Sequence, residues 1–105
     1  MVQAVLLTFR RRLSVIEAIR FANVLPPVLR ALFVTDWDPE EPQREFTDRA
    51  DLTSEIKALR RDHNFSPETA IRDVTTALRR HVDATALDDV LEHMPQGAAQ
   101  FWAVP

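Results

Sequence analysis

Two segments of this chain share one pattern of apolar and helix-breaking residues, and this repetition constrains the fold more than any other feature. Residues 2–33 and 71–102 align without a gap. Four aligned positions are identical, among them Val5 with Val74 and Pro26 with Pro95, and seven further pairs match two apolar residues larger than alanine. Repetition of a segment this long is typical of folds in which copies of one unit pack on each other. The pattern therefore predicts two copies of one helical unit.

Composition narrows the fold class further. The chain has 105 residues, which is enough for one domain with its own core. Its single glycine argues against an all-β fold, whose tight turns would require many. The absence of cysteine excludes disulfides and thiolate metal sites and fits a reducing cytoplasm. No apolar stretch approaches the roughly 18 residues of a membrane-spanning helix. We expect one all-α cytoplasmic domain, residues 1–105, without membrane contact.

The first unit, residues 2–33, is predicted to hold three helices. Apolar residues recur at helical spacing over 2–12, and three arginines end this helix, where cations complement the helix dipole. Ser14 and Glu17 form a capping-box pattern that begins the second helix. A proline pair ends that helix, and its second member can begin a short third helix over 27–33. The apolar positions of the second helix are Ile16, Ile19 and Phe21.

The second unit, residues 66–102, repeats this plan with other caps. Ser66 followed by proline favours a helix start, and Asp83 caps the next helix. Residues 34–65 join the units through a charged, proline-containing loop and a helix over 48–62. The predicted fold is a compact helical bundle of two repeated three-helix units joined by that loop and connecting helix.

The ordered combination of these features resembles the bacterial domain-of-unknown-function family 2267. The resemblance lies in the run 13–33, the DWDP motif at 36–39, the helix over 47–59 and the second copy from 77 to 102. It covers nearly the whole chain. It implies a small helical bacterial protein with an internal duplication, and it implies no established activity, cofactor or catalytic residue.

Members of that family have a further helix ahead of the position of Val2, equivalent to the helix over 48–62. This chain begins directly inside the first repeat, and a start placed too late would create the same gap. If both units need such a helix, Val2, Leu6 and Phe9 are left partly uncovered. Exposed apolar surface costs about 25 cal/mol per Å² relative to burial. We therefore expect self-association, with a dimer favoured, through these three residues.

Other candidate sites have simpler structural interpretations. Trp37 is a second interface candidate, but a tryptophan can equally pin a long loop to the core. Acids at 36, 38 and 40 are spaced like the start of a calcium loop, yet Glu41 and Thr47 occupy the positions that require glycine and glutamate. The three histidines are scattered, and no nucleophile motif is present. We expect no enzyme, no metal and no cofactor.

Basic residues provide the alternative function. Arg10 and Arg11 align with Arg79 and Arg80, so the two pairs could bind nucleic-acid phosphates symmetrically. Each pair also ends a helix, where cations are favoured in any case, and the net charge is −3. A small-ligand pocket between the units lacks a polar cluster to support it. The sequence thus favours an interaction module that binds itself, or another protein, over a nucleic-acid-binding protein.

Overall fold

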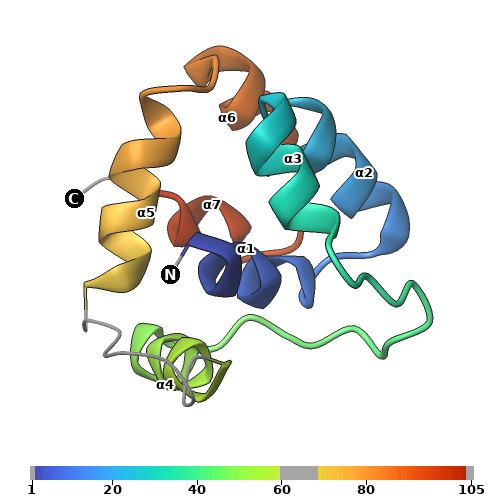
Figure 1. The fold of residues 1–105 in the computed structure, drawn as a ribbon, viewed down its shortest axis with the longest axis vertical. Helices are drawn as coiled ribbons and strands as arrows, with labels where there is room; N and C mark the ends of the chain where they lie inside the picture. The colour runs from blue at the N-terminus through green and yellow to red at the C-terminus, as the bar shows by residue number, and fades with distance from the viewer. Residues whose placement is uncertain (1, 60–68, 104–105) are drawn as a thin grey trace.

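The computed structural model describes residues 2–59 and 69–103, and every regular element within them is a helix (Figure 1). This confirms the predicted all-α fold class. In chain order the helices are α1 (Val2–Arg10), α2 (Val15–Asn23), α3 (Pro27–Val34), α4 (Arg49–Leu59), α5 (Ala70–Arg79), α6 (Ala84–Glu92) and α7 (Ala98–Phe101).

The helix starts follow the predicted capping chemistry where they can be compared. Ser14 Oγ accepts a hydrogen bond from the Glu17 amide at 3.2 Å, and the Glu17 carboxylate accepts one from the Ser14 amide at 2.8 Å, which completes the capping box of α2. Pro27 opens α3, and the Asp83 carboxylate caps α6. The predicted caps between residues 60 and 68 lie outside the described residues.

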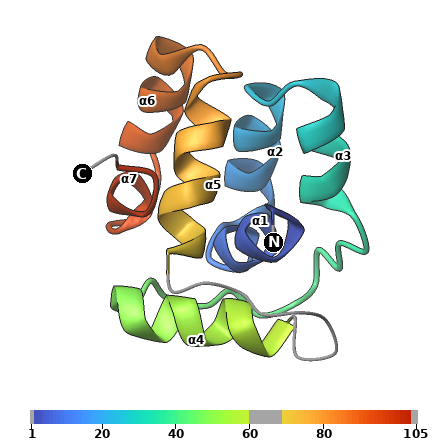
Figure 2. The ribbon, with the colours of Figure 1, turned by 60° about the vertical axis from the view of Figure 1, so that its left-hand side comes forward.

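The first helix, α1, lies in the middle of the fold. It packs against α3, α4 and α5, and Figure 2 shows it between α5 and α3 with α4 below. An aromatic cluster surrounds its Phe9, whose ring centroid lies 4.7 Å from that of Phe21, 5.0 Å from that of Phe101 and 5.2 Å from that of Trp102. All four rings are buried. Because large rings bury the most apolar area, this cluster dominates the core.

The prediction of an uncovered stripe on α1 is wrong. Leu6 and Phe9 are fully buried within the chain, and Val2 is half-buried against the core. The cause is the place of α4. Its position ahead of α5 in the sequence favours pairing with the second unit alone, but α4 packs on α1 of the first unit, and its first residue, Arg49, bonds the second unit at Gln100 O of α7. Leu6 and Phe9 therefore present no surface to another chain.

The two halves share the bounds of their second helix and a long-range contact made by an arginine. Both α2 and α6 are nine residues long, and their first residues, like their last, are 69 positions apart. Arg10 Nη1 donates to Phe33 O at 2.8 Å, and Arg79 Nε donates to Trp102 O at 2.7 Å, again at an offset of 69. Each arginine thus joins the end of its unit's first helix to the end of the third helical segment. An origin by duplication stays a prediction.

Candidate interaction surface

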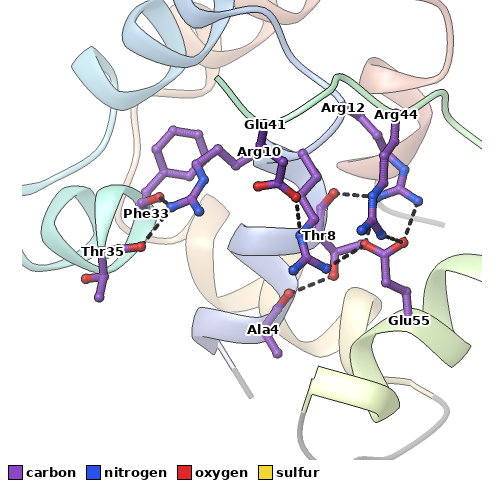
Figure 3. Close-up of polar contacts among 10 residues, drawn as sticks. Ala4, Thr8, Arg10, Arg12, Phe33, Thr35, Glu41, Arg44 and Glu55 are labelled. Carbon is purple, nitrogen blue, oxygen red and sulfur yellow. Dashed lines mark hydrogen bonds and ion pairs between the residues drawn. The ribbon is translucent and has the colours of Figure 1, made fainter. Parts of the chain in front are cut away.

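The arginines at the end of α1 face the protein interior. Arg12 is buried, and its guanidinium donates two hydrogen bonds to the Glu55 carboxylate, at 2.8 and 3.0 Å. Arg44 lies 3.1 Å from the same carboxylate and Arg11 lies 3.6 Å from it, as Figure 3 shows for Arg12 and Arg44. Charge-assisted, forked pairs of this kind are among the strongest hydrogen bonds in proteins. This Arg–Glu cluster fastens α4 to the end of α1.

The loop between α3 and α4 also contacts the end of α1. The Arg44 amide donates to Arg11 O at 2.9 Å, and Gln43 Nε2 donates to Arg12 O at 3.0 Å. These bonds satisfy carbonyls that the end of α1 leaves free. They also hold the chain ahead of α4 against the end of α1.

Electrostatics at Glu55 favour its charged form. Burial raises the pKa of the Glu55 carboxyl, but the hydrogen bonds from Arg12 and the charges of Arg12, Arg44 and Arg11 outweigh burial. The net result is a pKa below the ordinary value. The carboxylate is therefore ionised at neutral pH, where it pairs with these arginines.

The predicted nucleic-acid contacts are mostly engaged within the chain. Arg10 is buried and donates to the carbonyls of Phe33 and Thr35 at 2.8 and 3.0 Å (Figure 3). Burial, opposed in part by nearby acids, lowers its pKa. Arg11 lies between Glu41 and Glu55, and Arg79 binds Trp102 O.

Of these four arginines, only Arg80 is an exposed side chain. The structure does not bring the four guanidinium groups together on one open face. Phosphate binding through them stays a prediction.

The other interface candidate, Trp37, is half-buried and packs against the core. The Arg10 guanidinium carbon lies 5.9 Å from its ring centroid, within the range of a cation–π contact. The indole thus covers a buried arginine and attaches the charged loop to α1.

A different set of apolar residues is open to solvent. Within the described ranges, the exposed large apolar side chains lie on α2 and α3: Val15, Ile16, Ile19, Val28 and Val34. Ile16 is 63% exposed and Ile19 is 48% exposed, although the sequence suggests that both serve the apolar positions of the second helix. The reason is a competing apolar stripe that runs along α2 and continues just beyond its end. It consists of Ala18, Phe21, Ala22 and Leu25, all buried.

Beside these isoleucines, α2 and α6 enclose an apolar groove. The two helices are in contact, and the groove between them has a volume of about 530 Å³. Half-buried Val24, Val90 and Met94 contribute its apolar lining. Its polar lining residues are Glu17, Arg20, Asn23, Asp89 and His93. We call this feature the α2–α6 groove, and we call the exposed side of α2 formed by Ile16, Ile19 and Arg20 the α2 ridge.

Sequence reasoning considered a pocket between the two units but set it aside for want of a polar cluster, and it missed the ridge, although a signal for the ridge was present. The spacing of Ala18, Phe21, Ala22 and Leu25 at i, i+3, i+4 and i+7 defines one buried helix face. Ile16 and Ile19 fall off that face. The sequence alone therefore indicates that these two isoleucines lie on the outward side of α2.

Several kinds of site are absent from the described part of the chain. No group of three or more histidine and acidic side chains is placed there to hold a metal ion. Among the described helices, none combines the length and the apolar content that crossing a membrane requires.

Comparison with known proteins gives one family. Residues 1–101 match the family described as "Uncharacterized conserved protein (DUF2267)". No curated protein matches the chain.

Proposed function

We propose that this chain, which belongs to the DUF2267 family of uncharacterised conserved proteins, is a self-associating interaction module that works without catalysis. The surface that carries this function is the α2 ridge together with the α2–α6 groove. The first helix, which the sequence analysis favoured as the interface, packs inside its own chain.

One observation carries the proposal: two exposed isoleucines stand directly beside an apolar groove. Ile16 and Ile19 are adjacent in sequence to Glu17 and Arg20, which line that groove. Single exposed apolar residues are common on protein surfaces and need no explanation. An apolar ridge next to an apolar groove with a polar rim is different, because it forms a continuous surface of the kind used for protein contact.

The groove suits a helix better than a small ligand. It lies between two packed helices, and its polar lining residues Arg20, Asn23 and Asp89 are exposed rather than buried. Small-ligand sites normally hold the ligand with a few polar groups that converge in a buried pocket. An amphipathic helix instead needs an apolar floor for its anchors and charged rims for its flanks. That is what the α2–α6 groove offers.

The test is sedimentation velocity of the full chain over a concentration series. Because one helix face gives a small interface, we expect the weight-average sedimentation coefficient to rise between about 10 µM and about 1 mM. Ile16→Asp places a charge on the ridge, at its most exposed isoleucine, and should hold the protein monomeric. Since Ile16 is 63% exposed, this variant should keep the wild-type circular dichroism and melting temperature.

Val28→Asp is the matched control. Val28 lies on α3, is 74% exposed and does not line the groove, so this variant should associate like the wild type. A wild-type protein that stays monomeric up to about 1 mM would contradict the proposal. Loss of association in Val28→Asp with full association in Ile16→Asp would place the contact elsewhere and contradict it equally.

A further inference from the structure

Resting on the proposed function, we infer that two copies dock reciprocally: the α2 ridge of each chain lies in the α2–α6 groove of the other, and Arg20 of each chain pairs with Asp89 of its partner.

Geometry supports a reciprocal arrangement because one helix supplies both halves of the contact. Ile16 and Arg20 are one helical turn apart on the outer side of α2, and Val24, one turn further, lines the groove. Ridge and groove are therefore neighbours on a single surface. Two such surfaces related by a two-fold axis satisfy each other at once, which is the usual form of a closed dimer. Antiparallel α2 helices place each ridge over the opposite groove.

Charge supports the same partner. Arg20 is an exposed side chain of α2, and Asp89 is an exposed side chain of α6. Both line the groove, yet they form no ion pair with each other, and neither side chain has a charged partner among the described residues. The chain thus carries an unmatched cation on the ridge and an unmatched acid in the groove. A second copy provides the complement of both.

The other two titratable side chains that line the groove already have a partner in their own chain, and so has Asp88. The Glu17 carboxylate accepts the hydrogen bond of the Ser14 amide within the capping box. His93 has its Nδ1 2.9 Å from Asp89 O. Asp88, next to Asp89, lies 3.5 Å from Arg79. Arg20 and Asp89 are consequently the two groups of this surface that can set the register of the dimer.

The test is a charge-reversal experiment in which two variants that associate weakly alone should associate with each other. In Arg20→Asp, both contacts between positions 20 and 89 of the dimer become acid facing acid. In Asp89→Arg, both become arginine facing arginine. Since like charges across an interface weaken it, each variant alone should dimerise at least about tenfold more weakly than wild type.

An equimolar mixture of the two variants should form a heterodimer at wild-type concentrations. At one contact, the introduced acid of the Arg20→Asp chain faces the introduced arginine of the Asp89→Arg chain. At the other contact, the native Arg20 and the native Asp89 face each other. Both contacts of the heterodimer are therefore complementary in charge.

The double variant should also recover wild-type association. Arg80→Asp, which makes the same change of charge at an exposed residue outside the groove, should have no effect. Sedimentation velocity measures all five samples.

The outcomes separate this inference from the proposed function. If Ile16→Asp abolishes association but the mixture stays monomeric, the ridge is the contact surface and the reciprocal Arg20–Asp89 pairing is wrong. If the wild type does not associate at all, both are wrong. If each single variant associates weakly and their mixture associates like the wild type, Arg20 of one chain meets Asp89 of the other.

Discussion

At the scale of single residues, arginine side chains join helices that are far apart in the sequence. Arg10 and Arg79 reach the carbonyl ends of distant helical segments, and Arg12 binds Glu55 on α4. A long apolar stem with a forked donor can cross the core and still satisfy polar partners at its tip. The helix-end arginines could be predicted as dipole partners. Their bridging role could not, because the acceptors lie 23 to 43 positions away in the sequence.

Glu55→Gln tests the Arg–Glu cluster. The variant keeps the size of the side chain but leaves the buried Arg12 without its counter-charge, so we expect a loss of about 2 kcal/mol in the free energy of unfolding at pH 7. Glu45→Gln, at an exposed loop position, should lose almost nothing. Urea unfolding followed by circular dichroism measures both. Equal stability of Glu55→Gln and wild type would show that the cluster does not hold α4.

The same variant tests the pH dependence. The pKa of Glu55 is lower in the folded chain than its ordinary value of 4.5. Its contribution to stability is therefore fully present above that ordinary value and is lost as the pH falls through the lower, folded value. We expect the wild type to lose stability below about pH 4.5 more steeply than Glu55→Gln does, measured by urea unfolding across this range. Parallel curves would contradict the lowered pKa.

Gly97→Ala tests the one glycine in the chain. Gly97 has φ of +102°, and a Cβ built there would lie 2.7 Å from the Phe46 Cβ. Backbone strain and this clash should together cost about 2–3 kcal/mol in the free energy of unfolding. Ala99→Gly, nearby in α7 and exposed, is the control and should cost about 1 kcal/mol or less. A fully stable Gly97→Ala would show that Phe46 does not pack there.

At the scale of helices, the sequence predicts where helices begin and how they are capped, but it does not predict which helices pack together. The capping box at Ser14, the cap at Asp83 and the start at Pro27 depend on a few neighbouring residues, so the sequence alone predicts them. The partner of α4 depends on the path of the loop before it, which hydrogen bonds to Arg11 and Arg12 direct. No local pattern contains that path.

Ile56→Ala tests the docking of α4. Ile56 is fully buried, so removing its outer carbons leaves a cavity and should cost about 2–4 kcal/mol in the free energy of unfolding. Ser54→Ala, at an exposed position of the same helix, should change stability little or raise it slightly. Urea unfolding measures both variants. A loss below about 1 kcal/mol for Ile56→Ala would show that α4 contributes little to the core.

At the scale of the whole molecule, α2 and α6 have equivalent bounds and opposite surfaces. Ile19 and Arg20 of α2 align with Asp88 and Asp89 of α6, so the outward side is apolar and basic on one helix and acidic on the other. In the dimer that we propose, this asymmetry lets the α2 surface of one copy face the α6 surface of the other. The sequence contains these residues, but which of them face outward follows only from the packed structure.

The most direct measurement of the central claim is the dilution dependence of the ¹⁵N–¹H NMR spectrum. If the chain self-associates through the α2 ridge and the α2–α6 groove, chemical shifts that change between about 20 µM and about 1 mM should cluster on residues 15–24 and 89–94. The shifts of α4 and α5 should stay constant. A spectrum that does not change with concentration, or changes centred on α4 or α5, would contradict the account.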